Sequence, residues 1–98
     1  MAAYISGMEN TEVVDATERS RYELLVDGEL AGWADYRHDG EGRVVLPHAE
    51  VDPKRGGQGL GSHLAQAVFE DLREQGVEAV PTCSFMAAHL ARHPELGG

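Results

Sequence analysis

The sequence has little cysteine, few basic side chains and no long apolar runs. Its 98 residues contain a single cysteine, Cys83, which excludes an internal disulfide and fits a reducing compartment. Only 8 Lys and Arg stand against 17 Asp and Glu, so nucleic acid, which requires clustered cations, is not an expected partner. No run approaches the roughly 18–20 apolar residues of a membrane span, and Met1–Asp15 lacks the features of a signal peptide. We therefore expect a cytoplasmic protein with no membrane partner.

The remaining composition is that of an ordinary globular domain. Hydrophobic residues make up 42% and charged residues 26% of the chain, which excludes collagenous and broadly disordered classes. The formal charge of −9 favours cationic small molecules or basic peptides as partners, although acidity also serves solubility alone. Residues 1–11 show no sustained period and are predicted to be a loose arm, and residues 12–98 a single domain.

Alternating apolar residues predict an antiparallel meander in the first half of the domain. A short strand is expected near Val13–Asp15, and residues 21–26 alternate with period 2. Asp27-Gly28 follows, a dipeptide typical of the type I′ hairpin turn, in which both central residues have positive φ. The returning strand is predicted over residues 30–37, and the next one over residues 43–51.

The period then changes from that of a strand to that of a helix. Apolar residues recur at helical spacing between residues 60 and 75, and Gly76 follows at the position of a C′ glycine. Residues 77–83 form an apolar run that predicts a buried strand, parallel to the strand at 43–51 in a βαβ unit. A last helix is expected from Phe85 to about His93. The predicted fold is α+β: a meander, a βαβ unit with one parallel strand pair, and a C-terminal helix.

The segment KRGGQGLGS (54–62) joins the end of a strand to the start of a helix. Helix N-termini carry free N–H groups and partial positive charge, and glycines let the backbone approach a phosphate closely. The simpler interpretation is a flexible turn. A Walker A loop is excluded because Ser62 stands where lysine is required, and the spacing Gly57-x-Gly59-x-Gly61 differs from the dinucleotide fingerprint.

This glycine block resembles the signature of the GNAT superfamily of acetyl-CoA-dependent N-acetyltransferases. The chain is most similar to the small single-domain branch of that superfamily, the N-acetyltransferase-domain-containing type. The resemblance covers most of residues 13–95 and is carried by RYELLVDGELAGWADYR, HAEVDP, GQGLGS and CSFMAAHLARHPE. The chain departs from the pattern at Gly56, where the superfamily often has Arg or Gln, and at His89, where these proteins often have tyrosine.

The resemblance implies a GNAT-like mixed sheet, acetyl-CoA as co-substrate and a small-molecule or peptide amine as acceptor. The pantetheine arm of the coenzyme would pair with the backbone edge near Val51, and the loop amides would hold the pyrophosphate. Arg55 is expected to replace the residue missing at Gly56. The implied cofactor-binding residues are Val51, Arg55, Gly57, Gln58, Gly59, Leu60, Gly61 and Ser62.

Two residues of the strand before the loop are candidates for the catalytic base. His48 and Glu50 are two positions apart and so project from the same face of the strand. Either could accept the proton of the amine, although an exposed carboxylate and a structural imidazole are the simpler interpretations. Pro47, which cannot donate a ladder hydrogen bond, predicts a bulge or an unpaired edge just before them.

Cys83 and His89 are the remaining catalytic candidates. Cys83 ends the second parallel strand, where its thiol could relay a proton or take the acyl group transiently; a small buried core residue is the alternative. Ser84 is expected to cap the following helix. On that helix His89 could donate a proton to the leaving thiolate or merely pack. His89 and His93 also have metal-ligand spacing, but no third ligand is evident and no metal is expected.

Three functions are compatible with these patterns. The first is an N-acetyltransferase in which a primary amine attacks the thioester directly. The second is a non-catalytic module that binds acyl-CoA or CoA, and the third is a structural partner subunit with a vestigial loop. A monomer or a weak homodimer is expected, because a short chain with an exposed strand edge can pair with itself.

Overall fold

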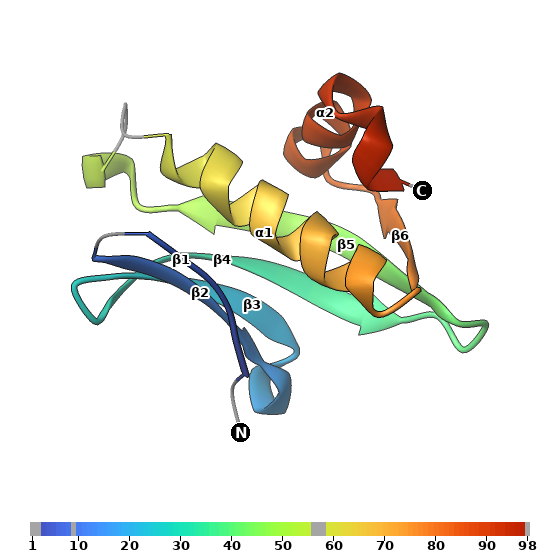
Figure 1. The fold of residues 1–98 in the computed structure, drawn as a ribbon, viewed down its shortest axis with the longest axis horizontal. Helices are drawn as coiled ribbons and strands as arrows, with labels where there is room; N and C mark the ends of the chain where they lie inside the picture. Colours follow the sequence, from blue (N-terminus) through green and yellow to red (C-terminus); the bar gives the residue numbers. More distant parts are fainter. Residues whose placement is uncertain (1–2, 9, 56–58, 98) are drawn as a thin grey trace.

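The computed structural model describes residues 3–8, as backbone alone, and residues 10–55 and 59–97. Within these ranges the chain forms one mixed sheet of six strands in the order β1-β2-β3-β4-β5-β6, and all neighbours are antiparallel except β5 and β6 (Figure 1). The strands are β1 (Ala3–Met8), β2 (Thr11–Ala16), β3 (Arg21–Val26), β4 (Glu29–His38), β5 (Arg43–Val51) and β6 (Glu78–Pro81). The helices are α1 (Leu60–Glu74) and α2 (Ser84–Arg92), with 3-10 turns at Thr17–Arg19, Pro53–Arg55 and Pro94–Gly97. The predicted α+β fold is confirmed.

The meander follows the sequence pattern closely. The hairpin between β3 and β4 turns at Asp27 and Gly28, whose φ angles are 53° and 82°. Both are positive, as the type I′ turn requires, so the dipeptide fixes the register of the two strands. The bounds of β3 and β5 are those predicted from the sequence.

The N-terminal segment differs from the expectation of a loose arm. Residues Ala3–Met8 form β1, which pairs antiparallel with β2 and lies at one edge of the sheet. The short strand expected near Val13–Asp15 is part of the longer β2. An edge strand held by backbone hydrogen bonds to one neighbour does not need an alternating apolar pattern. The period alone therefore could not reveal it.

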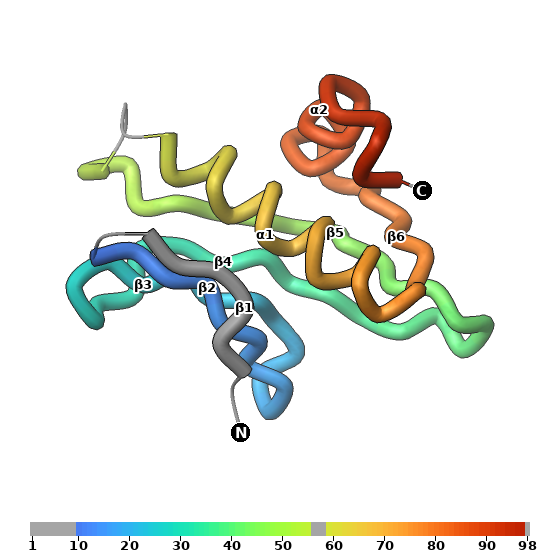
Figure 2. Tube along the Cα trace, in the orientation of Figure 1, coloured from blue at the N-terminus to red at the C-terminus, as the bar shows by residue number. Residues whose placement is uncertain are grey.

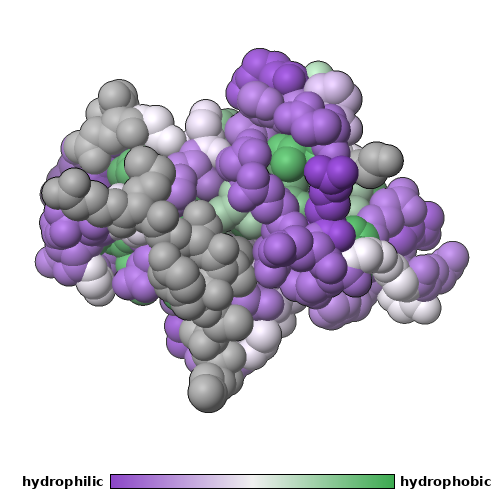
Figure 3. Space-filling view, viewed as in Figure 1, coloured by the Kyte–Doolittle hydropathy of each residue, from purple (hydrophilic) through white to green (hydrophobic). Residues whose placement is uncertain are grey.

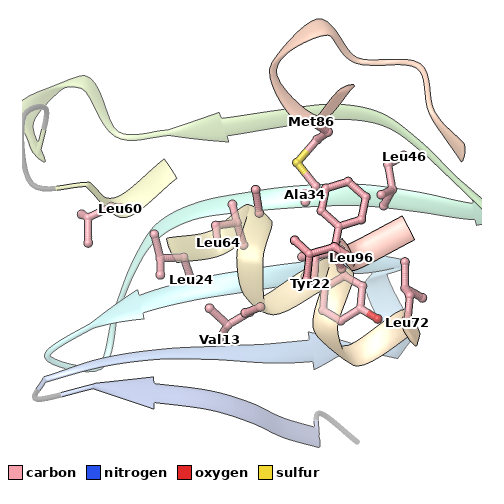
Figure 4. Packing of buried hydrophobic residues seen from close by; sticks show 14 of the residues in the cluster. Val13, Tyr22, Leu24, Ala34, Leu46, Leu60, Leu64, Leu72, Met86 and Leu96 are labelled. Atoms are coloured by element: carbon pink, nitrogen blue, oxygen red, sulfur yellow. The ribbon is translucent and has the colours of Figure 1, made fainter. Parts of the chain in front are cut away.

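The hydrophobic core lies between the sheet and α1, which crosses one of its faces (Figures 1 and 4). The apolar stripe of α1 predicted from the sequence faces this core. The buried side chains of the core include Val13, Tyr22, Leu24, Ala34, Leu46, Leu60, Leu64, Val68, Leu72, Met86 and Leu96. The Tyr22 hydroxyl donates a 2.7 Å hydrogen bond to Asp71 Oδ2 on α1, which ties the helix to β3. Burial and this hydrogen bond both raise the pKa of Tyr22.

The parallel pair and the last helix are confirmed, with two differences in their bounds. β6 is shorter than the predicted run 77–83 and ends at Pro81. Helix α2 begins at Ser84 with Cys83 as its N-cap, and no side chain caps it, so the predicted capping by Ser84 is wrong. The Cys83 carbonyl already accepts the first helical hydrogen bond, from Ala87 N at 2.9 Å, which places the helix start one residue earlier.

Candidate active site

The two parallel strands separate halfway along β5. Their pairing ends where Leu46 lies opposite Pro81, and the backbone N–H groups of Thr82 and Cys83 both donate to the Leu46 carbonyl, at 3.1 and 3.2 Å. Pro47 comes next and has no N–H, and the register between β4 and β5 shifts at the same place. The bulge predicted from Pro47 is confirmed. The trace in Figure 2 shows β5 continuing beyond the end of β6.

The free part of β5 directs backbone polar groups into the opening. The Asp52 N–H donates to the Ala31 carbonyl of β4 at 2.7 Å. The backbone polar groups of Asp52 and Glu50 therefore point toward β4. Because backbone groups alternate in direction along a strand, the N–H and C=O groups of Ala49 and Val51 point away from β4. Among the described residues no strand pairs with this edge beyond Leu46. The edge can therefore accept an extended ligand as an additional strand.

The glycine loop leads into the N-terminus of α1 beside this edge. Gly59 is the N-cap, with a positive φ of 71°, and the first turn of α1 has no acidic side chain to oppose an anion. Arg55 lines the adjoining cleft of about 310 Å³, and its Nε is buried without a hydrogen-bond partner. These features fit an anionic group such as a pyrophosphate. Gly57 and Gln58 lie outside the described residues.

Phe85, which the sequence patterns did not identify, links the helix terminus to the strand edge. A cleft of about 270 Å³ is lined by Ala49, Glu50, Val51, Gly61 and Phe85. The cleft at the glycine loop shares Val51, Gly61 and Phe85, so the two spaces adjoin. A Cβ built on Gly61 would lie 2.9 Å from Phe85 Cζ, which shows how closely the ring packs on α1. The sequence did offer one signal for Phe85: it is a large apolar residue that comes shortly after β6, the strand whose end opens the cleft.

His48 and Glu50 project from the face of the sheet opposite α1. The His48 Nε2 and Glu50 Oε2 atoms are 3.1 Å apart, and about half of each side chain is exposed. The prediction that they share a face is confirmed. Glu50 also lies opposite Trp33 of β4 and lines the cleft of the free β5 edge. A carboxylate in this position can take a proton from a group in the opening, and its role as base stays a prediction.

Cys83 precedes α2, and His89 lies within this helix. Cys83 is half-buried at the N-cap of α2. His89 is 3% exposed, stacks parallel to Phe69 at 6.3 Å between ring centroids, and its Nε2 is 3.0 Å from Gln66 Oε1. Burial first, and then the nearby charge of His93, lower the pKa of His89. Neither Cys83 nor His89 lines the 270 Å³ cleft, so the structure does not bring them together with Glu50.

The described part of the chain contains no group of three or more His, Cys, Asp and Glu residues that could hold a metal ion. In the same part of the chain, no helix is long and apolar enough to cross a membrane.

The separating parallel strands and the glycine-capped helix N-terminus beside them form one opening at this end of the sheet. The family model of GCN5-related N-acetyl-transferases matches residues 21–97, which is most of the chain. This protein therefore belongs to the GCN5-related N-acetyltransferase family and is an enzyme of the acetyltransferase class. Its fold is similar to the solution structure of a GCN5-like protein from Staphylococcus aureus, with a TM-score of 0.67 and 24% identity over 91% of this chain and 86% of that one.

Proposed function

We propose that the protein transfers the acetyl group of acetyl-CoA to a primary amine by direct attack on the thioester. The observation that carries the proposal is the separation of β5 from β6 next to the N-terminus of α1. One continuous opening thus offers an edge for the pantetheine arm and a terminus for the pyrophosphate. The family to which the chain belongs typically uses acetyl-CoA, which agrees with this use of the opening.

The residues around the opening have separate roles in this scheme. The Val51 edge pairs with the pantetheine arm, and Arg55, Gly57, Gln58, Gly59, Leu60, Gly61 and Ser62 surround the pyrophosphate. The backbone N–H of Ala49, which faces the opening, donates to the thioester oxygen as negative charge develops there. A resident base is needed because an ammonium ion must lose a proton before it can attack.

In this reaction the ammonium group loses two protons and the leaving thiolate gains one. Glu50, assisted by His48 at 3.1 Å, accepts a proton from the ammonium group. The amine nitrogen then bonds to the acetyl carbon and loses a second proton as the carbon–sulfur bond breaks. The leaving thiolate takes up a proton from Cys83 or His89, the second proton from nitrogen restores that donor, and Glu50 releases the first proton to solvent. A transient acyl-Cys83 would require the thiolate of Cys83 to attack first. The products are the N-acetylamine, free CoA and one proton released to solvent.

The first test measures the thermal midpoint with acetyl-CoA, ATP and NADH at equal concentrations. A ligand at 100 times its Kd stabilises by about 2.7 kcal/mol, which shifts the midpoint of a domain of this size by several degrees. We expect the shift with acetyl-CoA alone. Equal shifts with all three ligands, or none, would contradict the proposed coenzyme site.

Variants then separate catalysis from binding. Glu50→Gln should keep the acetyl-CoA shift and lose about 100-fold or more in kcat, measured by release of the CoA thiol. If the shift occurs and no amine in a broad panel is acetylated, the protein is a coenzyme-binding module instead. Cys83→Ala with full activity would exclude both roles of the thiol.

A further inference from the structure

A second cavity, lined by residues of β4 and β5, adjoins the coenzyme cleft. It has a volume of about 300 Å³ and is lined by Leu30, Ala31, Gly32, Trp33, Glu50, Val51, Asp52 and Pro53. Glu50 and Val51 belong to both this cavity and the 270 Å³ cleft. A molecule in the second cavity would therefore lie against Glu50 and Val51, the two residues that it shares with the cleft proposed for the coenzyme. Its volume is at the lower end of the range for small-molecule sites.

The lining of this cavity is apolar with acidic groups at its edge. Among the described residues, the large apolar side chains that stand exposed are Leu30, at 46%, and Phe85, at 38%. Leu30 lines the second cavity and Phe85 the coenzyme cleft, so each of the two spaces has one of these side chains. Beside Leu30 lie Trp33 and Pro53, and the half-exposed carboxylate of Glu50 closes the end nearest the thioester.

Side chains of the neighbouring strand hold the Trp33 ring in place. The Arg21 guanidinium lies 5.1 Å from the centroid of the Trp33 ring, and it is itself bound to Glu23 at 2.8 Å. Arg19 donates two more hydrogen bonds to Glu23, which lower the pKa of that carboxyl, and it lies 3.7 Å from Glu18. Two carboxylates thus offset the two guanidinium groups. The indole is a preorganised wall, and the acidic residues that line the cavity are Glu50 and Asp52.

We infer that this cavity is the acceptor site and that the acceptor is a small arylalkylamine or a similar amphiphilic amine. Its ammonium group would contact Glu50, and its apolar or aromatic group would pack on Leu30 and Trp33. The net charge of −9 favours such a cation over an anionic acceptor. This inference rests on the proposed function, because it assigns the substrate class of the same reaction.

The first experiment measures binding without turnover. Trp33 is the only tryptophan in the chain, so its fluorescence reports directly on this cavity. The protein with CoA is titrated with 2-phenylethylamine, ethylamine and spermidine. We expect saturable quenching by 2-phenylethylamine, with a half-saturating concentration at least about tenfold lower than that of ethylamine or spermidine. No change in fluorescence with 2-phenylethylamine, or a stronger response to spermidine, would overturn the assignment.

The second experiment compares kcat/KM for 2-phenylethylamine and ethylamine at saturating acetyl-CoA. The ratio should be about 10 or more, and Leu30→Ser should lower it about three- to tenfold without changing the Kd of acetyl-CoA. Leu30→Met, which keeps the apolar volume, is the matched control and should preserve the ratio. A ratio near 1, an unchanged ratio in Leu30→Ser, or preferred acetylation of a lysine peptide would overturn the assignment. Quenching without turnover of any amine would contradict the proposed function alone.

Discussion

At the scale of single residues, the buried side chain of His89 has a defined set of neighbours. The Gln66 amide nitrogen donates to Glu70 at 2.9 Å, so its oxygen faces the imidazole and the hydrogen-bond network assigns the proton of His89 to Nε2. The other ring nitrogen, Nδ1, is buried without a partner. Protonation of Nδ1 would place a charge in a buried position beside His93, which explains why the pKa of His89 is lowered.

This environment predicts a pH dependence of stability. The pKa of His89 is lower in the folded state than in the unfolded chain. As pH falls below about 6.5, the unfolded chain therefore binds more protons than the folded protein, and the free energy of unfolding decreases until the pH reaches the folded-state pKa. His89→Gln, which keeps a donor toward Gln66, should cost about 1 kcal/mol at pH 7.5 but lose less between pH 7.5 and 5.5 than the wild type. Urea unfolding at both pH values tests this.

The control for this prediction is His38→Gln, which replaces an exposed histidine on β4. It should lose stability between pH 7.5 and 5.5 as the wild type does. If His89→Gln and the wild type lose the same free energy over this interval, then His89 does not cause the pH dependence.

At the scale of elements, the contact between α1 and α2 shapes the coenzyme cleft. Phe85, in the first turn of α2, packs against Gly61, in the first turn of α1. A methyl group at position 61 would force the tip of the ring to move, since 2.9 Å is too short for two carbon atoms. The ring lines both spaces assigned to the coenzyme, so its position and the shape of the cleft change together.

Gly61→Ala should therefore weaken acetyl-CoA binding about three- to tenfold, measured by calorimetry. Its thermal midpoint should fall little or rise, because alanine has a helix propensity about 1 kcal/mol better than glycine. The double variant Gly61→Ala with Phe85→Ala relieves the clash and is the test of cause. If the single variant binds acetyl-CoA as tightly as the wild type, the Phe85 ring does not define the cleft.

Most of the strands and helices, but not all of them, could be predicted from the sequence. Strands with one buried face and the long helix α1 were predictable, because burial imposes period 2 or 3.6 on the residues. β1 was not, since an edge strand depends on its neighbour's backbone. Within the site, the common face of His48 and Glu50 follows from their spacing on one strand. The positions of Phe85 and Trp33 do not, because each lines its cavity through contacts between elements far apart in the sequence.

At the scale of the whole molecule, charge is distributed unevenly around the proposed coenzyme and acceptor sites. The chain has a formal charge of −9, and the described part of the face shown in Figure 3 is mainly hydrophilic. Arg55 lines the cleft at the N-terminus of α1, where an anionic coenzyme would bind, and its Nη2 also donates to Glu29 Oε1 at 3.1 Å. The second cavity has the carboxylates of Glu50 and Asp52. The two proposed substrates, one anionic and one cationic, thus each meet the opposite charge.

This distribution predicts that salt slows the use of cationic amines. An acidic protein attracts a cation over distances that salt screens, with a Debye length of about 10 Å at 0.1 M. At saturating acetyl-CoA, kcat/KM for 2-phenylethylamine should fall about two- to tenfold between 0.02 and 0.2 M NaCl. The control acceptor is phenylhydrazine, a nucleophile that is neutral at the assay pH and should lose much less. If both acceptors lose activity equally, salt acts on the enzyme itself, and the net charge has no part in capturing the amine.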